Sequence, residues 1–135
     1  MDFTEKKTSF NTSRYFTRSK PSIKKYEEEK YESKLFLDDN VNRRDFGGLR
    51  YKDFYKTSLK DKPLISIITP NFKSPDLEKT IISILKQEYE NLELIIIDAD
   101  SGKETVQILK KYDDQIDLWV SEVDNGLWDG WNKGL

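Results

Sequence analysis

The sequence predicts an α/β fold whose second half builds a parallel sheet. Runs of β-branched and aliphatic residues at 64–69, 92–97 and 116–120 are typical of short buried strands. Segments with helical apolar spacing separate these runs. Strands that alternate with helices form parallel sheets through right-handed crossovers, so we expect a β-α-β-α-β unit. For the first 62 residues we expect a mostly helical or irregular extension.

The composition bounds the possible chemistry. The chain has 135 residues, with no cysteine and no histidine, which suits one domain with an appendage. Disulfide frameworks, thiol nucleophiles, zinc fingers and Ser-His-Asp triads are therefore excluded. Any metal site must use oxygen ligands, which favours Mg²⁺, Mn²⁺ or Ca²⁺. Because no apolar run reaches the ~20 residues of a membrane span and no signal peptide opens the chain, we expect a cytoplasmic protein.

Charge divides the chain near residue 62. Residues 1–62 hold 16 Lys/Arg and 11 Asp/Glu, a net of +5, whereas residues 63–135 hold 7 Lys/Arg and 14 Asp/Glu, a net of −7. Nearly all isoleucines follow Pro63. We therefore expect a basic N-terminal extension over 1–62 and the main folded unit over 63–135.

The extension is the less informative part. Residues 1–20 are polar and without period, so we expect a flexible tail, and residues 21–36 are expected to form a helix. Basic and aromatic residues together could fit nucleic acid or an anionic membrane surface. The acidic run 27–29 interrupts that pattern, so we favour a tail that docks a few aromatic residues. We expect residues 35–60 to dock on the main unit. We also expect the chain to form a homodimer, to bind no nucleic acid and to make at most peripheral contact with a membrane.

The main unit opens with strand 64–69, which Pro70 is expected to end. Ser74 is the expected N-cap of the next helix, and Asp76 lies near its positive end. The helix carries one apolar stripe, formed by Leu77, Ile81, Ile84 and Leu85.

Strand 92–97 is apolar enough to be buried on both faces. Ser101 and Glu104 have capping-box spacing, which predicts a helix through residue 112. Strand 116–120 follows, and residues 127–135 are expected to begin a third helix.

In parallel α/β sheets, ligands bind beyond the carboxyl ends of the strands. Residues 69–72, 98–101 and 122–126 follow the three strands there. The 69–76 loop has no glycine, which argues against a dinucleotide turn. Phe72 could stack on a base while Asp98 accepts a ring N–H, such as N3–H of uracil. Each residue alone could equally serve loop packing or helix capping.

Four ordered blocks resemble family 2 glycosyltransferases of the GT-A (Rossmann-like) fold. The blocks are PLISIITPNF (63–72), TIISILKQEY (80–89), IIID with Ser101 (95–101) and WVSEVDNGLWDGWNKG (119–134). The last block is similar to that family's S-E-x-D-x-G-I-Y-D-A-M-N-K-G segment. A leader at Gly47–Arg50 is similar to one of bacterial polysaccharide-cluster members.

The resemblance implies a nucleotide-sugar donor, usually a UDP-sugar. Pro70 and Phe72 would flank the uracil, Asp98 would accept N3–H, and Asp124 would contact the base or ribose. The full set of expected nucleotide-binding residues is Thr69, Pro70, Phe72, Asp98, Asp124, Asp129 and Lys133.

The resemblance also bears on metal and catalysis. Asp98 and Asp100 spell D-x-D, the family's metal motif, but that motif belongs after the next strand, beyond residues 132–134. We therefore expect this chain to end before the D-x-D strand and to contain neither metal ligands nor catalytic residues. The full-length enzyme is expected to need Mg²⁺ or Mn²⁺, and the chain alone to be inactive.

Two functions remain open at this point. The first is inverting transfer of a sugar to a glycan or lipid-linked acceptor in cell-surface polysaccharide synthesis, at the cytoplasmic side. The alternative is a non-catalytic module that binds nucleotide or another protein.

Overall fold

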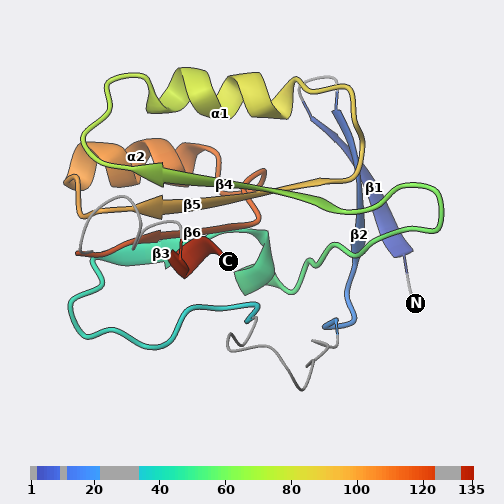
Figure 1. The fold of residues 1–135 in the computed structure, drawn as a ribbon, viewed down its shortest axis with the longest axis horizontal. Coiled ribbons are helices and arrows are strands. Elements are labelled where there is room, and N and C mark those ends of the chain that lie inside the picture. Colours follow the sequence, from blue (N-terminus) through green and yellow to red (C-terminus); the bar gives the residue numbers. More distant parts are fainter. Residues whose placement is uncertain (1–2, 10–11, 22–33, 124–131) are drawn as a thin grey trace.

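A four-stranded sheet forms the centre of the protein in a computed structural model that describes residues 3–9, 12–21, 34–123 and 132–135. The strand order is β3-β6-β5-β4; β4–β5 and β5–β6 are parallel, and β3–β6 is antiparallel. The strands are β3 (Asp45–Gly47), β4 (Ile65–Asn71), β5 (Leu92–Asp98) and β6 (Leu118–Ser121). Helices α1 (Leu77–Leu85) and α2 (Lys103–Lys111) lie together on one face (Figure 1). The predicted α/β fold is confirmed.

Strand β5 lies inside the sheet, and every one of its residues is buried. Alternate side chains point to opposite faces. Leu94 and Ile96 pack with the apolar stripes of α1 and α2. Ile95 and Ile97 pack on the other face with Leu118 and Val120 of β6. This explains why the sequence of β5 is continuously apolar rather than alternating.

The face opposite the helices is covered by segments from both ends of the chain. Phe36 and Leu37 of the extension pack against the β5–β6 cluster, together with Ile68 of β4. Residues 132–134 are helical, in agreement with the end of the expected third helix, whose residues 127–131 lie outside the described part. A Cβ atom on Gly134 would collide with the Ile68 side chain, so the glycine permits close approach to β4.

Pro70 does not end the first strand as expected. Strand β4 continues to Asn71, and Pro70 lies opposite Ile97 in the parallel ladder. Among the described residues β4 is an edge strand, and a strand that pairs on one side tolerates a missing N–H. A homodimer formed through such an edge stays a prediction.

The expected helical or irregular structure of the extension is wrong for residues 3–17, and the flexibility of the tail stays a prediction. These residues form an antiparallel hairpin of β1 (Phe3–Ser9) and β2 (Thr12–Thr17). Threonine and aromatic residues favour strands, and tertiary contacts hold the end of β2. Thr17 and Tyr55 exchange two backbone hydrogen bonds of 2.8 and 2.9 Å, and the buried Phe16 ring contacts Phe54 edge to face. Most of the helix expected over 21–36 lies outside the described residues.

The rest of the extension docks on the sheet, as expected. Strand β3 pairs with β6, and a 3-10 helix (Leu49–Lys52) follows it. The backbone N–H of Leu49 donates to the Ile116 carbonyl at 2.9 Å, and the backbone N–H of Arg50 donates to the backbone carbonyl of Asp117 at 3.0 Å. Arg50 also forms a buried 2.9 Å ion pair with Glu93 of β5. The described residues 34–62 are therefore part of the folded unit.

Both predicted helix caps are wrong. Helix α1 begins after Asp76, and the Ser74 hydroxyl instead accepts the Asp76 N–H at 3.2 Å. Helix α2 begins after Gly102, because the Ser101 hydroxyl is bound elsewhere. The hydroxyl donates to the Asp98 carboxylate at 2.5 Å, and its oxygen, which a cap would use as acceptor, accepts the Lys73 backbone N–H at 2.7 Å.

None of the helices in the described ranges combines the length and apolarity needed to cross a membrane.

Candidate nucleotide site at the strand tips

Asp98 is the centre of a hydrogen-bond network at the carboxyl edge of the sheet. Its side chain is fully buried. Oδ1 accepts hydrogen bonds from the Asn71 amide at 2.8 Å and the Ser101 hydroxyl at 2.5 Å. Oδ2 accepts from the Ser101 backbone N–H at 3.0 Å and the Ser121 hydroxyl at 2.7 Å. A carboxylate has about four acceptor positions, so protein donors already satisfy this one.

The network joins the tips of three parallel strands. Asn71 ends β4, Asp98 ends β5 and Ser121 ends β6, and the three residues lie opposite one another in the ladder. Backbone hydrogen bonds reinforce this level, from Ala99 to Asn71 at 2.8 Å and from Glu122 to Asp98 at 2.9 Å. The predicted convergence of the strand tips is therefore confirmed, although Asp98 serves first as the acceptor that holds them together.

Phe72 presents an aromatic surface directly beyond this level. Its side chain is 65% exposed, and the Lys73 ammonium lies 5.1 Å from the ring centroid, so much of the ring is accessible. Lys73 follows with a positive φ of 50°, and its backbone N–H donates to the Ser101 hydroxyl at 2.7 Å. Thr69 and Pro70 are half-buried within β4. The loop after β4 is thus tied to the loop after β5, with the Phe72 ring outward.

Asp100 lies on the other side of the same loop. Its backbone is left-handed, with φ of 51°, and its carboxylate forms a 2.5 Å ion pair with the Nε of Arg44. The hydrogen bond to Asp100 raises the pKa of the Arg44 guanidinium, and the charges of Asp100 and Asp98 act in the same direction. Arg44 comes from the extension, so this contact links residues far apart in the sequence.

The local D-x-D pair does not have the donor set of a divalent-metal site. Both oxygens of Asp98 accept protein hydrogen bonds, and Asp100 is neutralised by Arg44. Within residues 3–9, 12–21, 34–123 and 132–135, no group of three or more acidic side chains could hold a metal ion. The donor set of Asp98 and Asp100 therefore does not fit Mg²⁺ or Mn²⁺.

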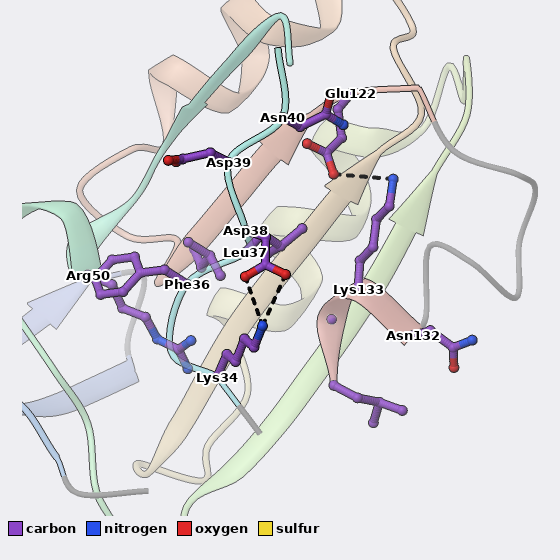
Figure 2. A pocket seen from close by; sticks show the side chains of 13 residues that line it. Lys34, Phe36, Leu37, Asp38, Asp39, Asn40, Arg50, Glu122, Asn132 and Lys133 are labelled. Carbon is purple, nitrogen blue, oxygen red and sulfur yellow. Dashed lines mark hydrogen bonds and ion pairs between the residues drawn. The ribbon is translucent and has the colours of Figure 1, made fainter. Parts of the chain in front are cut away.

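Lys133 borders a pocket of about 410 Å³ on the face opposite the helices (Figure 2). Its ammonium lies 3.2 Å from Glu122 and donates to the Val123 carbonyl at 3.0 Å. Glu122 is buried and also accepts from the Nε of Arg43 at 2.7 Å. Figure 2 shows Glu122 and Asn40 near the strand ends, whereas Lys34 lies farther back along the face. Lys133 is thus tied to Glu122 rather than to the Asp98 network.

Two predicted site residues, Asp124 and Asp129, lie outside the described residues. The residues that sequence reasoning missed are Arg43, Arg44 and Ser121. Ser121 carried a signal, because it ends the third strand where polar tips were expected. For Arg43 and Arg44 the only signal in the sequence was the charge difference between the basic extension and the acidic main unit. That difference does not show which acid each arginine binds.

The comparison with known families decides the classification. The family model described as "Glycosyl transferase family 2" matches residues 66–135, which includes the strand tips and the segment up to Leu135. The chain belongs to glycosyltransferase family 2. This confirms the family resemblance in the four sequence blocks and agrees with the half-fold of parallel strands.

Named relatives of this family 2 chain come from several bacteria. It is 36% identical over 75 residues to an uncharacterized glycosyltransferase of Mycobacterium tuberculosis, covering 54% of this chain and 29% of that protein. It is 35% identical over 78 residues to the putative teichuronic acid biosynthesis glycosyltransferase TuaG of Bacillus subtilis, covering 55% of this chain and 31% of TuaG. It is 39% identical over 64 residues to the GalNAc(5)-diNAcBac-PP-undecaprenol beta-1,3-glucosyltransferase of Campylobacter jejuni, covering 44% of this chain and 21% of that protein.

The chain therefore spans less than a third of the length of these curated relatives. No solved structure matches it.

Proposed function

We propose that this family 2 chain binds the nucleotide of a sugar donor, and that the donor is a UDP-sugar. The observation that carries the proposal is the exposed Phe72 ring, which lies next to the Asp98 network where three parallel strands end. An exposed aromatic ring stacks well on a nucleobase, and the carboxyl edge is where α/β sheets bind ligands.

Uracil suits this edge because its N3–H can be accepted by a carboxylate. Asp98 is the proposed acceptor, and Pro70 and Phe72 are proposed to flank the base. Since four protein donors already contact Asp98, base binding requires that one of them yields, most simply a serine hydroxyl that rotates away. Thr69, Asp124 and Asp129 complete the proposed nucleotide-binding set, and Lys133 is proposed to support it through its ion pair with Glu122.

We propose that the complete enzyme transfers the sugar to a glycan or lipid-linked acceptor by inverting displacement. Two relatives support the acceptor class through their names, one with teichuronic acid biosynthesis and one with an undecaprenol-diphosphate glycan. The acceptor pocket and the general base are not assigned to residues of this chain.

Calorimetry with UDP, CDP, GDP and ADP tests the nucleotide preference. We expect UDP to bind most tightly, because the proposed pocket accommodates a pyrimidine and reads its N3–H. Equal or tighter binding of GDP or ADP would overturn the pocket assignment. Binding of all four with equal affinity would favour a non-selective nucleotide module over a glycosyltransferase donor site.

We also propose that the 135-residue chain transfers no sugar by itself. Transfer requires that the charge on the leaving diphosphate be neutralised. The described acids cannot supply a metal site for that purpose, since Asp98 and Asp100 are both committed to protein partners. The test is release of UDP from UDP-sugars with and without Mn²⁺. Turnover that depends on Mn²⁺ and disappears in Asp100→Ala would contradict the proposal.

A further inference from the structure

The extension reaches the carboxyl edge of the sheet, where the donor is proposed to bind. Strand β3 runs antiparallel to β6, so Asp45 at the start of β3 lies opposite Ser121 at the end of β6. The backbone N–H of Arg44 donates to the Ser121 carbonyl at 2.8 Å. In Figure 1 the segment before β3 turns at the same end as the arrowheads of β4 and β5. Arg43 and Arg44 are therefore placed beside the strand tips.

This edge needs positive charge to accept a nucleotide. A nucleoside diphosphate is strongly anionic, and the strand tips carry Asp98, Asp100 and Glu122. Like charges repel, so cations must offset these acids before a diphosphate can approach. The main unit has a net charge of −7, whereas the extension has +5.

Two of the cations near this edge are committed to structural contacts. The Arg43 side chain is 8% exposed, and besides Glu122 it donates to the Asp38 carbonyl at 2.6 Å. Lys133 is bound to Glu122 and to the Val123 carbonyl. Both side chains neutralise Glu122 and hold the segments around it, so neither is well placed to bind the phosphates of a ligand.

Arg44 is placed differently. Its side chain is 45% exposed, and its ion pair with Asp100 uses the Nε position. A guanidinium has five N–H donors in a fixed fork, so the terminal amino groups can bind a second anion while Nε holds Asp100. Arg44 also lines a pocket of about 330 Å³ formed by residues 39–41 and 43–46.

We propose that Arg44 binds the diphosphate of the donor nucleotide, with Asp100 as the positioning residue that holds the guanidinium. The inference rests on the proposed donor site. Phe72 follows β4 and Arg44 precedes β3, the two edge strands of the sheet, and the loop that follows β5 lies between them, since Lys73 binds Ser101 and Arg44 binds Asp100. A nucleotide whose base stacks on Phe72 and whose ribose crosses this loop brings its phosphates to Arg44.

The test compares uridine, UMP and UDP binding to the wild-type chain, Arg44→Gln and Lys60→Gln by calorimetry. Lys60 is a matched control, because it is an exposed cation of the extension in the connection before β4, at the opposite end of that strand. Loss of a charge-assisted hydrogen bond should weaken UDP binding of Arg44→Gln about 10-fold or more. Uridine affinity should stay unchanged in both variants, and Lys60→Gln should bind UDP like the wild type.

The outcomes separate this inference from the proposed function. If the wild type binds UDP and Arg44→Gln keeps the wild-type ratio of UDP to uridine affinity, the role of Arg44 is overturned. If the wild type binds none of the three, the donor site itself is overturned, and this inference with it. Arg44→Lys provides a second variant should Arg44→Gln fold poorly. It keeps the charge but loses the fork, so we expect it to retain a preference for UDP that is weaker than wild type.

Discussion

Lys56 and Asp117 form an ion pair that solvent scarcely reaches. The Lys56 ammonium lies 2.8 Å from Asp117 Oδ2, and the two side chains are 1% and 2% exposed. The ammonium also donates to the Leu92 carbonyl at 2.7 Å, while the same Asp117 oxygen accepts the Leu94 N–H at 2.8 Å. A cation of the extension thus satisfies polar groups at the start of β5 and just before β6. The buried Asp117 carboxylate of the main unit therefore depends on the extension for its cation.

Lys56→Met should destabilise the protein strongly. The variant leaves the Asp117 carboxylate buried without its cation, which typically costs about 3–5 kcal/mol. Urea unfolding followed by tryptophan fluorescence measures the loss. Lys60→Met, at an exposed position of the same segment, is the control and should change little. The double variant Lys56→Met/Asp117→Leu should recover only part of the loss, because it removes the unpaired charge but also the acceptor of the Leu94 N–H. A single variant as stable as the wild type would refute the importance of the pair.

Gly48 should tolerate substitution less well than Gly102. Both glycines have a positive φ, of 106° and 114°. A Cβ on Gly48 would lie 2.7 Å from the Asp117 carbonyl oxygen, whereas the nearest atom to one on Gly102 is a Glu104 carboxylate oxygen at 3.9 Å.

Each alanine substitution should therefore cost about 1–3 kcal/mol of backbone strain, with a further cost at Gly48 alone because the 3-10 helix must move away from β6. Denaturation of Gly48→Ala and Gly102→Ala in parallel measures the difference. Equal losses would mean that the close approach at Gly48 relaxes freely.

Asp113 should make stability depend on pH in the acid range. Burial alone would raise the pKa of its carboxyl group, but hydrogen bonds from Lys52, Trp119 and the Gly48 backbone hold the pKa below its ordinary value of 3.8. A carboxyl group whose pKa is lower in the folded state stabilises that state above its unfolded pKa. The contribution is lost as the pH falls through the lower folded pKa.

Asp113→Asn should accordingly melt at a lower temperature than the wild type at pH 7. The gap should narrow once the pH drops below about 4, near the unfolded pKa of aspartate. Thermal melts of both proteins between pH 7 and the acid limit of solubility measure this gap. A gap that stays constant with pH would contradict a stabilising role for the ionised carboxylate.

The sequence predicted the main unit well because its signals are local. The continuous apolar run of β5 and the helical stripe from Leu77 to Leu85 depend on burial patterns that each segment carries alone. The convergence of Asn71, Asp98 and Ser121 also followed, since parallel strands bring their carboxyl ends to one edge. The fold of the main unit was therefore predictable without knowledge of distant contacts.

The errors arose where distant partners decide local structure. Ser101 has the spacing of a capping box, yet its hydroxyl donates to Asp98 and its oxygen accepts the Lys73 N–H, partners that come within reach only after the strands assemble. The hairpin of β1 and β2 meets Tyr55 through Thr17, and Arg44 meets Asp100 across 56 positions. No period or motif in one segment signals such pairs.

Asp98→Asn should impair folding as well as nucleotide binding. Asparagine is neutral, so the buried hydrogen bonds from Asn71, Ser101 and Ser121 lose their charged acceptor, and an amide nitrogen at the Oδ2 position would face the fixed Ser101 N–H. Since hydrogen bonds to charged groups contribute about 1.5–3 kcal/mol each, we expect a clear loss of stability in urea unfolding. The substitution therefore cannot by itself establish that Asp98 binds the base.

Phe72→Ala separates nucleotide binding from folding. The ring is 65% exposed, so its loss should change the free energy of unfolding by no more than about 0.5 kcal/mol. Stacking of a base on an aromatic ring contributes about 1–3 kcal/mol, so UDP binding should weaken about 5- to 150-fold. Ile65→Ala, which removes an exposed apolar side chain at the opposite end of β4, is the control and should bind UDP like the wild type. Unchanged UDP affinity in a fully folded Phe72→Ala variant would show that the base does not stack on this ring.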